Sequence, residues 1–116
     1  MADDCLFCKI ANGDFNTEFV YEDDAVVAFR DLQPQASTHV LVIPRQHIAT
    51  INDIDADNSA IVGRMYIAAK EVAASEGLAE RGYRAVMNCN AEAGQTVFHI
   101  HLHLLGGKPM GWPPWP

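Results

Sequence analysis

The sequence predicts an α+β domain in which one long helix packs on a five-stranded antiparallel sheet. Short apolar runs with strand character recur along the chain, and only one long stretch has helical apolar spacing. Most connections between these segments are short, which favours antiparallel pairing. The 116 residues contain no internal repeat and no dividing linker, so residues 1–116 are expected to form one domain with a sizeable core.

The first third of the chain predicts a short helical turn and a strand hairpin. Residues 4–12 suit the helical turn, which Gly13 ends. Strands at 19–21 and 25–30 flank the acidic turn at 22–24, a pattern typical of a hairpin. Pro34 then breaks the chain, and the β-branched run at 39–43 predicts a third strand that Pro44 stops.

One long helix is expected next. Asp57 or Asn58 can cap its first turn, and Gly77 is well suited to end it. Its apolar stripe consists of Ile61, Met65, Ala68, Ala69, Val72 and Ala73. Residues 84–89 predict a fourth strand, 90–95 a polar loop, and 98–105 a fifth strand that a Gly-Gly pair ends.

The fifth predicted strand contains the most informative pattern, because His99, His101 and His103 alternate with apolar residues. Successive strand side chains point to opposite faces, so the three imidazoles are expected on one face, with the apolar residues facing a core. Imidazole can act as a nucleophile, proton carrier or metal ligand near neutral pH. The pattern alone leaves open whether this face performs chemistry or binds a metal.

Charge and cysteine content limit the class of function. The net charge of −7 argues against broad contact with a nucleic-acid backbone, although a small nucleotide can still bind through local groups. The first residues resemble no signal peptide, and no apolar run is long enough to span a membrane. Three cysteines without a secretory context predict a reduced, cytoplasmic protein.

A second motif, Cys5-Leu6-Phe7-Cys8, has several interpretations. A pair with this spacing is half of a zinc site, a redox pair or a coincidence. The thioredoxin-like βαβ context that favours a redox role is absent. Structural zinc needs four ligands, for which thiolate and imidazole are preferred.

The histidine run has the form His-φ-His-φ-His-φ-φ at 99–105, where φ is apolar, and resembles the signature of the histidine-triad (HIT) superfamily of nucleotide hydrolases and transferases. Further segments, in the same order over nearly the whole chain, resemble its nucleotide-binding branch: Phe29-Arg30-Asp31, Pro34-Gln35-Ala36, 38–44, 82–84, Asn88, Gly94-Gln95 and 105–107. The resemblance implies a HIT-like fold with a short N-terminal helix, whose sheet joins that of a second copy in a homodimer.

The branch contains purine nucleoside phosphoramidases, so the resemblance implies hydrolysis of purine nucleoside 5′-phosphoramidates and aminoacyl adenylates at the α-phosphorus. His101 is the implied nucleophile that forms a nucleotidyl-histidine, which water then hydrolyses. Neutral imidazole suits this task when a backbone carbonyl holds its other, protonated nitrogen. His103 is expected to bond a phosphate oxygen or the scissile region, His39 to orient the site, and Thr96 to replace a family serine near the leaving group.

The resemblance also implies a nucleotide pocket. Asp31 is expected to bond the ribose hydroxyls, Asn88 to contact the ribose or phosphate, and Gln95 with the N–H groups around Gly94 to hold the α-phosphate. The positions that enclose the purine are Leu6, Phe7, Phe29, Leu32 and Leu41. From the residues alone, Asp31 is also a common turn residue, and most of the apolar positions read as core.

Many HIT relatives with the cysteine pair bind zinc through both cysteines, a histidine after the third strand and the first triad histidine. Those positions are Cys5, Cys8, His47 and His99, so the resemblance implies a structural Zn²⁺ that takes no part in the chemistry. The Trp/Pro-rich tail at 111–116 is implied to reach the other subunit's site through Trp112. A flexible terminus and a proline-rich ligand are the alternatives for this tail.

Three other functions stay open. The chain can be a nucleotide-binding regulatory module with incidental catalysis, a hydrolase that holds one catalytic metal with all three triad histidines, or a dinucleoside polyphosphate hydrolase. The intact triad with Thr96 and Gln95 favours the phosphoramidase over the regulatory module. The short chain and its Trp-Pro-Pro ending count against the polyphosphate hydrolase.

Overall fold

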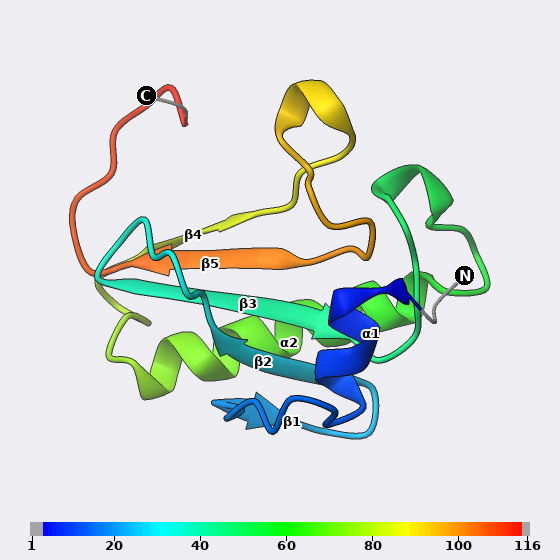
Figure 1. Ribbon diagram of the computed structural model, residues 1–116. Helices are drawn as coiled ribbons and strands as arrows, with labels where there is room; N and C mark the ends of the chain where they lie inside the picture. The colour runs from blue at the N-terminus through cyan, green and yellow to red at the C-terminus, as the bar shows by residue number, and fades with distance from the viewer. Residues whose placement is uncertain (1–3, 115–116) are drawn as a thin grey trace.

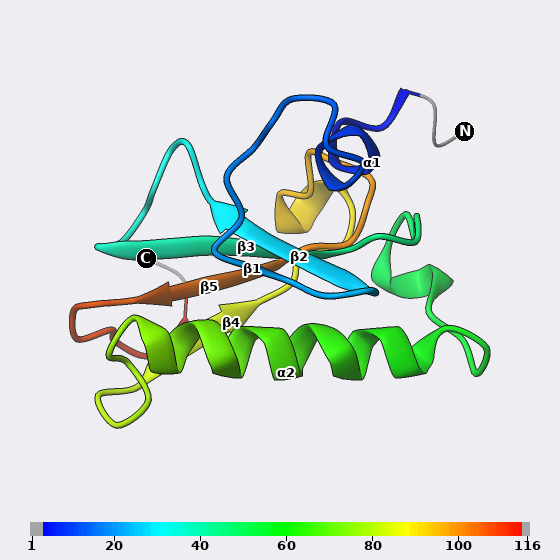
Figure 2. The same ribbon diagram turned by 90° about the horizontal axis from the view of Figure 1, so that it is seen from below.

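The computed structural model describes residues 4–114 as one sheet with a helix on each face (Figures 1 and 2). Its strands are β1 (Tyr21–Glu22), β2 (Val26–Arg30), β3 (Thr38–Pro44), β4 (Tyr83–Val86) and β5 (Leu102–Gly106). They lie in the order β1-β2-β3-β5-β4, and each neighbouring pair is antiparallel. Helix α1 (Leu6–Ala11) and helix α2 (Ser59–Ser75) cover opposite faces, which confirms the predicted α+β class.

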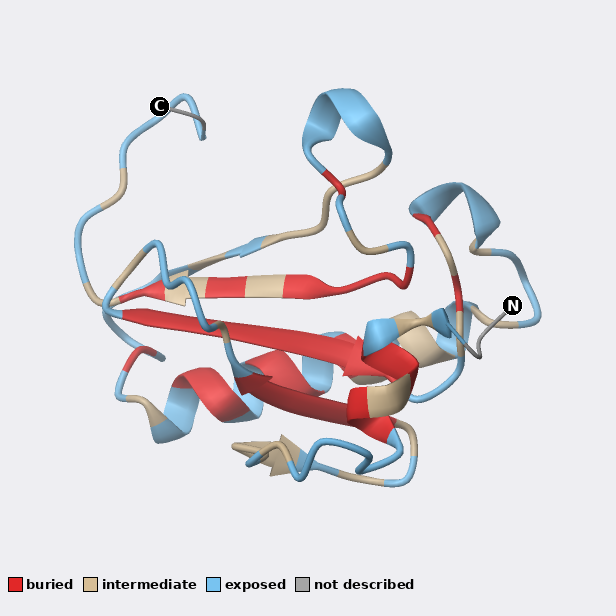
Figure 3. Ribbon diagram, viewed as in Figure 1, coloured by how far each residue is buried: buried red, intermediate tan, exposed pale blue. Residues whose placement is uncertain are grey.

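Strand alternation divides the apolar residues into two cores. The larger core lies between the sheet and α2, where residues such as Val42 and Leu104 meet Met65. The smaller core packs Phe7 and Ile10 of α1 against the opposite face of β2 and β3. Strand β3 serves both cores and is buried along its whole length (Figure 3). This double burial explains why residues 40–44 of the strand are all apolar.

Helix α2 matches the predicted stripe, with Met65, Ala68, Ala69, Val72 and Ala73 all buried. Gly77 follows its end with φ +76°, the left-handed conformation that glycine adopts readily. Asn58 is the N-cap residue, one of the two predicted, but its side chain makes no bond to the first turn of the helix. Its side chain accepts from the Asp55 N–H and donates to the Asp53 carbonyl, so it closes the preceding turn instead.

Within residues 4–114 no helix is long and apolar enough to cross a bilayer.

Several other boundaries differ from prediction by a few residues. The hairpin is confirmed, and the Asp23 carboxylate closes its turn by accepting from the N–H groups of Ala25 and Val26. However, β1 begins two residues later than predicted, and β4 begins one residue earlier and ends at Val86. The loop at 90–95 contains the 3-10 turn η3 (Ala91–Ala93), and a second one, η2 (Ile51–Asp53), precedes α2.

The prediction of a strand over 98–105 is wrong for its first four residues, because β5 begins at Leu102. The ladder between β3 and β5 ends at the pair Val42 and Leu102. Beyond that pair the Ile100 N–H donates to the Ile48 carbonyl, and Pro44 has no N–H to continue a ladder. The predicted alternation nevertheless holds, since Ile100 lies in the α2 core while the ring of His101 meets Phe7 on the opposite side.

The tail after β5 returns along the sheet edge, where Arg84 donates to the Gly111 carbonyl at 2.7 Å. Trp112 is 83 % exposed within this chain. The last two residues of the predicted Trp/Pro tail, Trp115 and Pro116, lie outside the described residues.

Candidate active site and metal centre

The central histidine of the triad, His101, has one ring nitrogen in a hydrogen bond and the other free, as a nucleophile requires. The Nδ1 of His101 lies 2.8 Å from the backbone carbonyl of His99, which can only accept a hydrogen bond. The proton of the neutral ring is therefore on Nδ1, and the Nε2 lone pair is free. The ring is buried and meets the Phe7 ring edge to face, with centroids 5.0 Å apart. Burial lowers the pKa of His101, although the His99 carbonyl and Asp31 oppose this effect, so the ring stays neutral near pH 7.

The third triad histidine lies on the same face of the sheet as His39. Register pairs His103 with Leu41 and His39 with Leu105, which places all four side chains on the α1 side. The His39 Nε2 lies 2.9 Å from the His103 Nδ1 and 3.3 Å from a carboxylate oxygen of Asp31. The rings of His101 and His103 have centroids 5.1 Å apart. Sequence-predicted residues from three segments therefore meet here.

Burial also depresses the pKa values of the neighbouring imidazoles. For His103 the burial, with the nearby His101 and His39, lowers the pKa to about 4. For His39 burial lowers the pKa, and the charge of Asp31 partly opposes it. A neutral cluster suits phosphate chemistry because neutral imidazole attacks without the repulsion that an anionic nucleophile meets.

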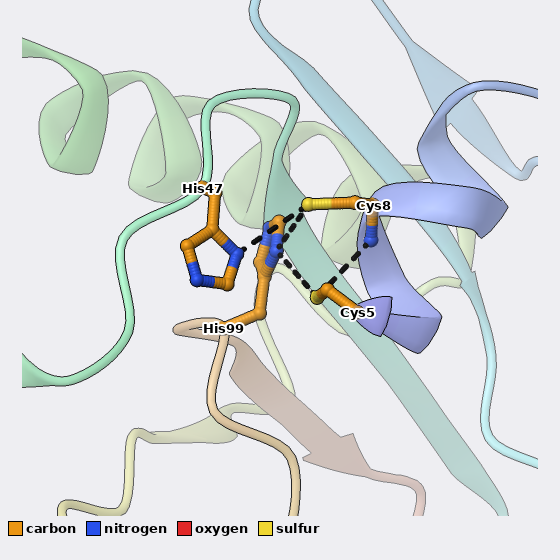
Figure 4. A group of neighbouring side chains, drawn as sticks. All are labelled: Cys5, Cys8, His47 and His99. Atoms are coloured by element: carbon orange, nitrogen blue, oxygen red, sulfur yellow. Dashed lines mark hydrogen bonds between the residues drawn. The ribbon is translucent and has the colours of Figure 1, made fainter. Parts of the chain in front are cut away.

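The first triad histidine belongs to a different cluster, which contains all four predicted metal ligands (Figure 4). The Nδ1 of His99 lies 3.3 Å from the Cys5 sulfur and 3.4 Å from the Cys8 sulfur. The Nδ1 of His47 lies 3.4 Å from the Cys8 sulfur. All four donor atoms lie within 4.8 Å of one another.

These separations fit a tetrahedral zinc ion. Zn–S and Zn–N bonds of about 2.3 and 2.0–2.1 Å place neighbouring S and N ligands about 3.5 Å apart. The His99 Nε2 donates to the Pro44 carbonyl at 2.7 Å, which leaves the Nδ1 lone pair directed at the cysteines. Metal-bound histidines commonly have such a backbone partner on their other nitrogen. The donor set, its spacing and its backbone support therefore suit a closed structural zinc site.

Burial keeps two members of this cluster uncharged in the absence of a cation. Burial, with Cys5 beside it, raises the pKa of the Cys8 thiol to about 11. Burial lowers the pKa of His99 to about 4. Both groups are neutral in the absence of a cation, and a bound metal ion would draw the proton from the thiol.

The geometry does not support one catalytic ion held by all three triad histidines. The Nδ1 of His99 faces the cysteines, whereas the Nδ1 of His103 faces His39. Within residues 4–114 these two histidines fall into separate groups of candidate metal ligands. Their partners assign the two ends of the triad to different tasks.

The five residues expected around the purine divide into a buried and an exposed set. Phe7 and Phe29 meet edge to face at 5.8 Å and are buried with Leu41 in the smaller core. Leu6 is 46 % exposed and Leu32 is 97 % exposed. A cleft of about 430 Å³ is lined by Phe29 and Leu32 together with Thr17, Glu18, Val20 and Arg30. The structure therefore brings two of the five to one concave surface.

In the loop expected to hold the α-phosphate, the hydrogen-bond donors of Gly94 and Gln95 already have acceptors within the protein. The buried side chain of Gln95 accepts from the Asn90 N–H and donates to the carbonyls of Ala49 and Val97. The backbone N–H groups of Gly94 and Gln95 donate to carbonyls of the same loop. Gln95 thus braces the loop, and these bonds would have to exchange before it held a phosphate. Its binding role, like that of Gly94, stays a prediction.

The remaining predicted residues lie at the edges of the site. Thr96 is exposed and lines a cleft of about 400 Å³ that also contains Leu6, His47 and Phe98. Asn88 is half-buried just beyond the end of β4. The roles of Thr96 at the leaving group and Asn88 at the ribose or phosphate stay predictions.

Sequence reasoning missed the backbone partners of His39 and His99. The Gln35 N–H donates to the His39 Nδ1 at 3.0 Å, and the Pro44 carbonyl accepts from His99. Nearly every residue has the same backbone N–H and carbonyl, so residue type does not indicate which backbone group will bond a histidine. Pro34 marks a break in the chain next to Gln35, but it does not indicate which acceptor the Gln35 N–H meets.

Comparison with known proteins agrees with this geometry. A HIT domain model matches residues 12–110. The chain is 50 % identical over 111 residues to the purine nucleoside phosphoramidase of Escherichia coli K12, covering 96 % of this chain and 93 % of that protein.

Solved structures show the same fold. A HIT family hydrolase from Legionella pneumophila is 55 % identical and superposes with a TM-score of 0.93, covering 97 % of this chain and all of that one. A HIT family hydrolase from Clostridium thermocellum is 46 % identical with a TM-score of 0.92, covering 96 % of each chain. With its histidine triad, its fold and these matches together, the chain belongs to the HIT family.

Proposed function

We propose that this protein hydrolyses purine nucleoside 5′-phosphoramidates and related aminoacyl adenylates. The observation that carries the proposal is the bond from the His101 Nδ1–H to the His99 carbonyl, which leaves Nε2 free to attack. The 50 % identical E. coli relative, named a purine nucleoside phosphoramidase, supports the substrate class. The HIT family hydrolases among the similar structures support hydrolysis as the reaction type.

The reaction proceeds in two displacements at phosphorus. The His101 Nε2 forms a bond to the α-phosphorus as the P–N bond breaks. The departing amine takes a proton from solvent water, and the water that attacks in the second displacement returns a proton to the solvent. Water then attacks the nucleotidyl-histidine, releasing nucleoside monophosphate and restoring the neutral ring. Donors near the phosphoryl oxygens stabilise the charge that develops there, and His103 is the nearest imidazole to His101. Thr96 lies on the leaving-group side, and Asp31 and Asn88 bind the ribose end.

The metal cluster has a structural task in this proposal. Cys5, Cys8, His47 and His99 would hold Zn²⁺, which would tie α1 and the segment after β3 to the chain that leads into β5. When bound, the ion supplies cross-linking only, because the phosphate chemistry belongs to His101. Phe7 lies between the two cysteines in the sequence, so the same ion would also support its contact with the His101 ring.

We also propose a homodimer in the cytoplasm in which two sheets join. Strand β4 ends the sheet within residues 4–114, so one edge of its backbone has no strand partner there. Tyr83 on this strand is 39 % exposed, and Trp112 in the adjacent tail is 83 % exposed. Large exposed aromatic residues beside an open strand edge suit a protein interface, where Trp112 of each copy approaches the partner's site.

The test compares the wild type with His101→Ala on adenosine 5′-phosphoramidate. We expect turnover to fall by at least about 10³-fold, because the variant lacks the nucleophile. Binding of adenosine monophosphate, measured by calorimetry, is expected to persist. Turnover at the native rate would overturn the proposal, whereas binding without turnover by the wild type would indicate the regulatory module.

A further inference from the structure

We propose that the backbone N–H of Gln35 fixes the proton positions of two histidines in series, His39 and then His103, so that His103 faces the substrate as a neutral N–H donor. The catalytic meaning of this arrangement rests on the proposed function. The proton arrangement itself follows from the geometry of the described residues alone.

The series begins at the turn after β2. The Gln35 N–H donates to the His39 Nδ1 at 3.0 Å, with the hydrogen directed at the nitrogen. An amide N–H cannot accept, so the His39 Nδ1 is an unprotonated acceptor. A neutral imidazole has one N–H, which places the His39 proton on Nε2. His39 is 5 % exposed, so its ring has little access to water as an alternative partner.

The second link is the contact between the two imidazoles. The His39 Nε2 lies 2.9 Å from the His103 Nδ1, too close for a proton on each nitrogen. Because the proton belongs to His39, the His103 Nδ1 accepts and the proton of neutral His103 is on Nε2. Asp31 orients the donor ring, since its Oδ2 lies 3.3 Å from the His39 Nε2 while its Oδ1 accepts from the Gln33 N–H.

This arrangement disfavours charging either ring. A second proton on His39 would go to Nδ1, where it would face the Gln35 N–H. A second proton on His103 would also go to Nδ1, where it would face the His39 N–H. The groups that face the pair are His101, Asp31 and the Gln35 amide, and of these only Asp31 favours a cation. The lowered pKa values of both histidines, which burial dominates, agree with this conclusion.

The result is two neighbouring imidazoles with opposite proton positions. His101 has its proton on Nδ1 and a free Nε2, whereas His103 has a free Nδ1 and a proton on Nε2. Their ring centroids are 5.1 Å apart. One ring therefore attacks phosphorus while the other offers a preset donor to the phosphoryl oxygens, where negative charge develops. Gln35 and His39 are positioning residues in this scheme, since neither needs to touch the substrate.

The test is ¹⁵N–¹H correlation NMR of the imidazoles in zinc-loaded protein without substrate near pH 7. We expect His39 and His103 to show a protonated Nε2 and an unprotonated Nδ1, and His101 to show the reverse. A charged His103, or a His103 with its proton on Nδ1, would overturn the inference. These spectra need no turnover, so a failure of the proposed phosphoramidase activity is distinguishable from a failure here.

Two pairs of variants distinguish the loss of a hydrogen-bond donor from a general disturbance of the structure. Q35P removes the N–H that begins the series, whereas its control Q35A keeps the N–H and loses only the side chain, which bonds the Gln33 carbonyl. We expect Q35A to retain the wild-type proton pattern and Q35P to shift the His103 nitrogens toward an average of both tautomers. Unchanged His103 shifts in folded Q35P would contradict the role of Gln35.

The second pair keeps the experiment decisive if Q35P does not fold. H39Q offers an amide N–H near the position of the imidazole Nε2, and H39L has similar bulk without a donor. We expect H39Q to restore a single His103 tautomer with Nε2 protonated, and H39L to give a mixture of tautomers. The same His103 shifts in H39L as in the wild type would show that His39 does not set this proton.

Discussion

The two ends of the histidine triad lie within five residues of each other, yet their surroundings give them different chemistry. His99 has one nitrogen on the Pro44 carbonyl and the other on two cysteine sulfurs. His103 has one nitrogen on His39, whose own other nitrogen is fixed by a backbone N–H. The partner of one ring nitrogen therefore determines what the other nitrogen can do. His101, between them, uses a carbonyl to free its nucleophilic nitrogen.

The largest expected effect is a loss of thermal stability when the metal site at the His99 end is destroyed. Cys8→Ser, or chelation of the wild type, is expected to lower the melting temperature by more than about 10 °C, because a structural zinc contributes several kcal/mol of folding free energy. Thermal unfolding followed by circular dichroism, with metal content measured in parallel, tests this. Cys89→Ser is the matched control, since Cys89 is half-buried and outside the cluster. An equal loss in both variants would contradict the metal role.

The next effect concerns Phe7, which contacts both regions. Its buried ring lies 6.0 Å from the His99 ring and 5.0 Å from the His101 ring, measured between centroids. Phe7→Ala leaves a cavity, and we expect a loss of about 3–4 kcal/mol in urea unfolding. The control is Phe15→Ala, because Phe15 is 54 % exposed and its loss is expected to cost within about 0.5 kcal/mol. Similar costs at the two positions would show that Phe7 does not connect the regions.

The third prediction uses acid to test the His103 end. Because burial lowers the pKa of His103 from its usual value of 6.5 to about 4, the unfolded chain binds this proton more readily than the folded protein does. Stability is therefore full above pH 6.5 and falls as the pH drops toward 4. We expect His103→Asn to flatten the urea-unfolding free energy between pH 6.5 and 5, by an amount on the order of 1 kcal/mol. Identical pH profiles for variant and wild type would contradict the depressed pKa.

The smallest effect is expected at an exposed ion pair outside the two histidine clusters. Arg30 makes two bonds with Glu76 at 2.8 and 3.2 Å, but the Arg30 side chain is 55 % exposed. Arg30→Gln is expected to change the unfolding free energy by no more than about 1 kcal/mol, because solvent screens such pairs. A larger loss in the same urea titration would mean that this pair supports the β2 end of the site more than its exposure indicates.

Periodicity predicted the layers of the fold well. The stripe on α2 and the apolar run of β3 reflect burial, which residue type reports directly. The start of β5 was missed because it depends on where the partner strand stops donating, at Pro44. The Asn58 side chain was misassigned because capping and turn closure use the same side-chain groups.

The candidate site was predictable in its side chains and only partly in its backbone partners. The pattern of alternating histidines pointed to chemistry or metal binding, and the family resemblance selected Cys5, Cys8, His47 and His99, which the fold gathers. The amide of Gln35 could not be predicted, because every residue but proline has one. The internal bonds of Gln95 were also missed, since an amide side chain suits a phosphate and a loop carbonyl equally.

The most direct test of the central claim is to trap the covalent intermediate. Turnover of adenosine 5′-phosphoramidate is quenched on the millisecond timescale, and the digested protein is analysed by mass spectrometry. We expect an adenylyl group on the peptide that contains His101, formed and lost at rates that match turnover. An adduct on a different residue, or the same adduct yield from His101→Ala, would contradict it.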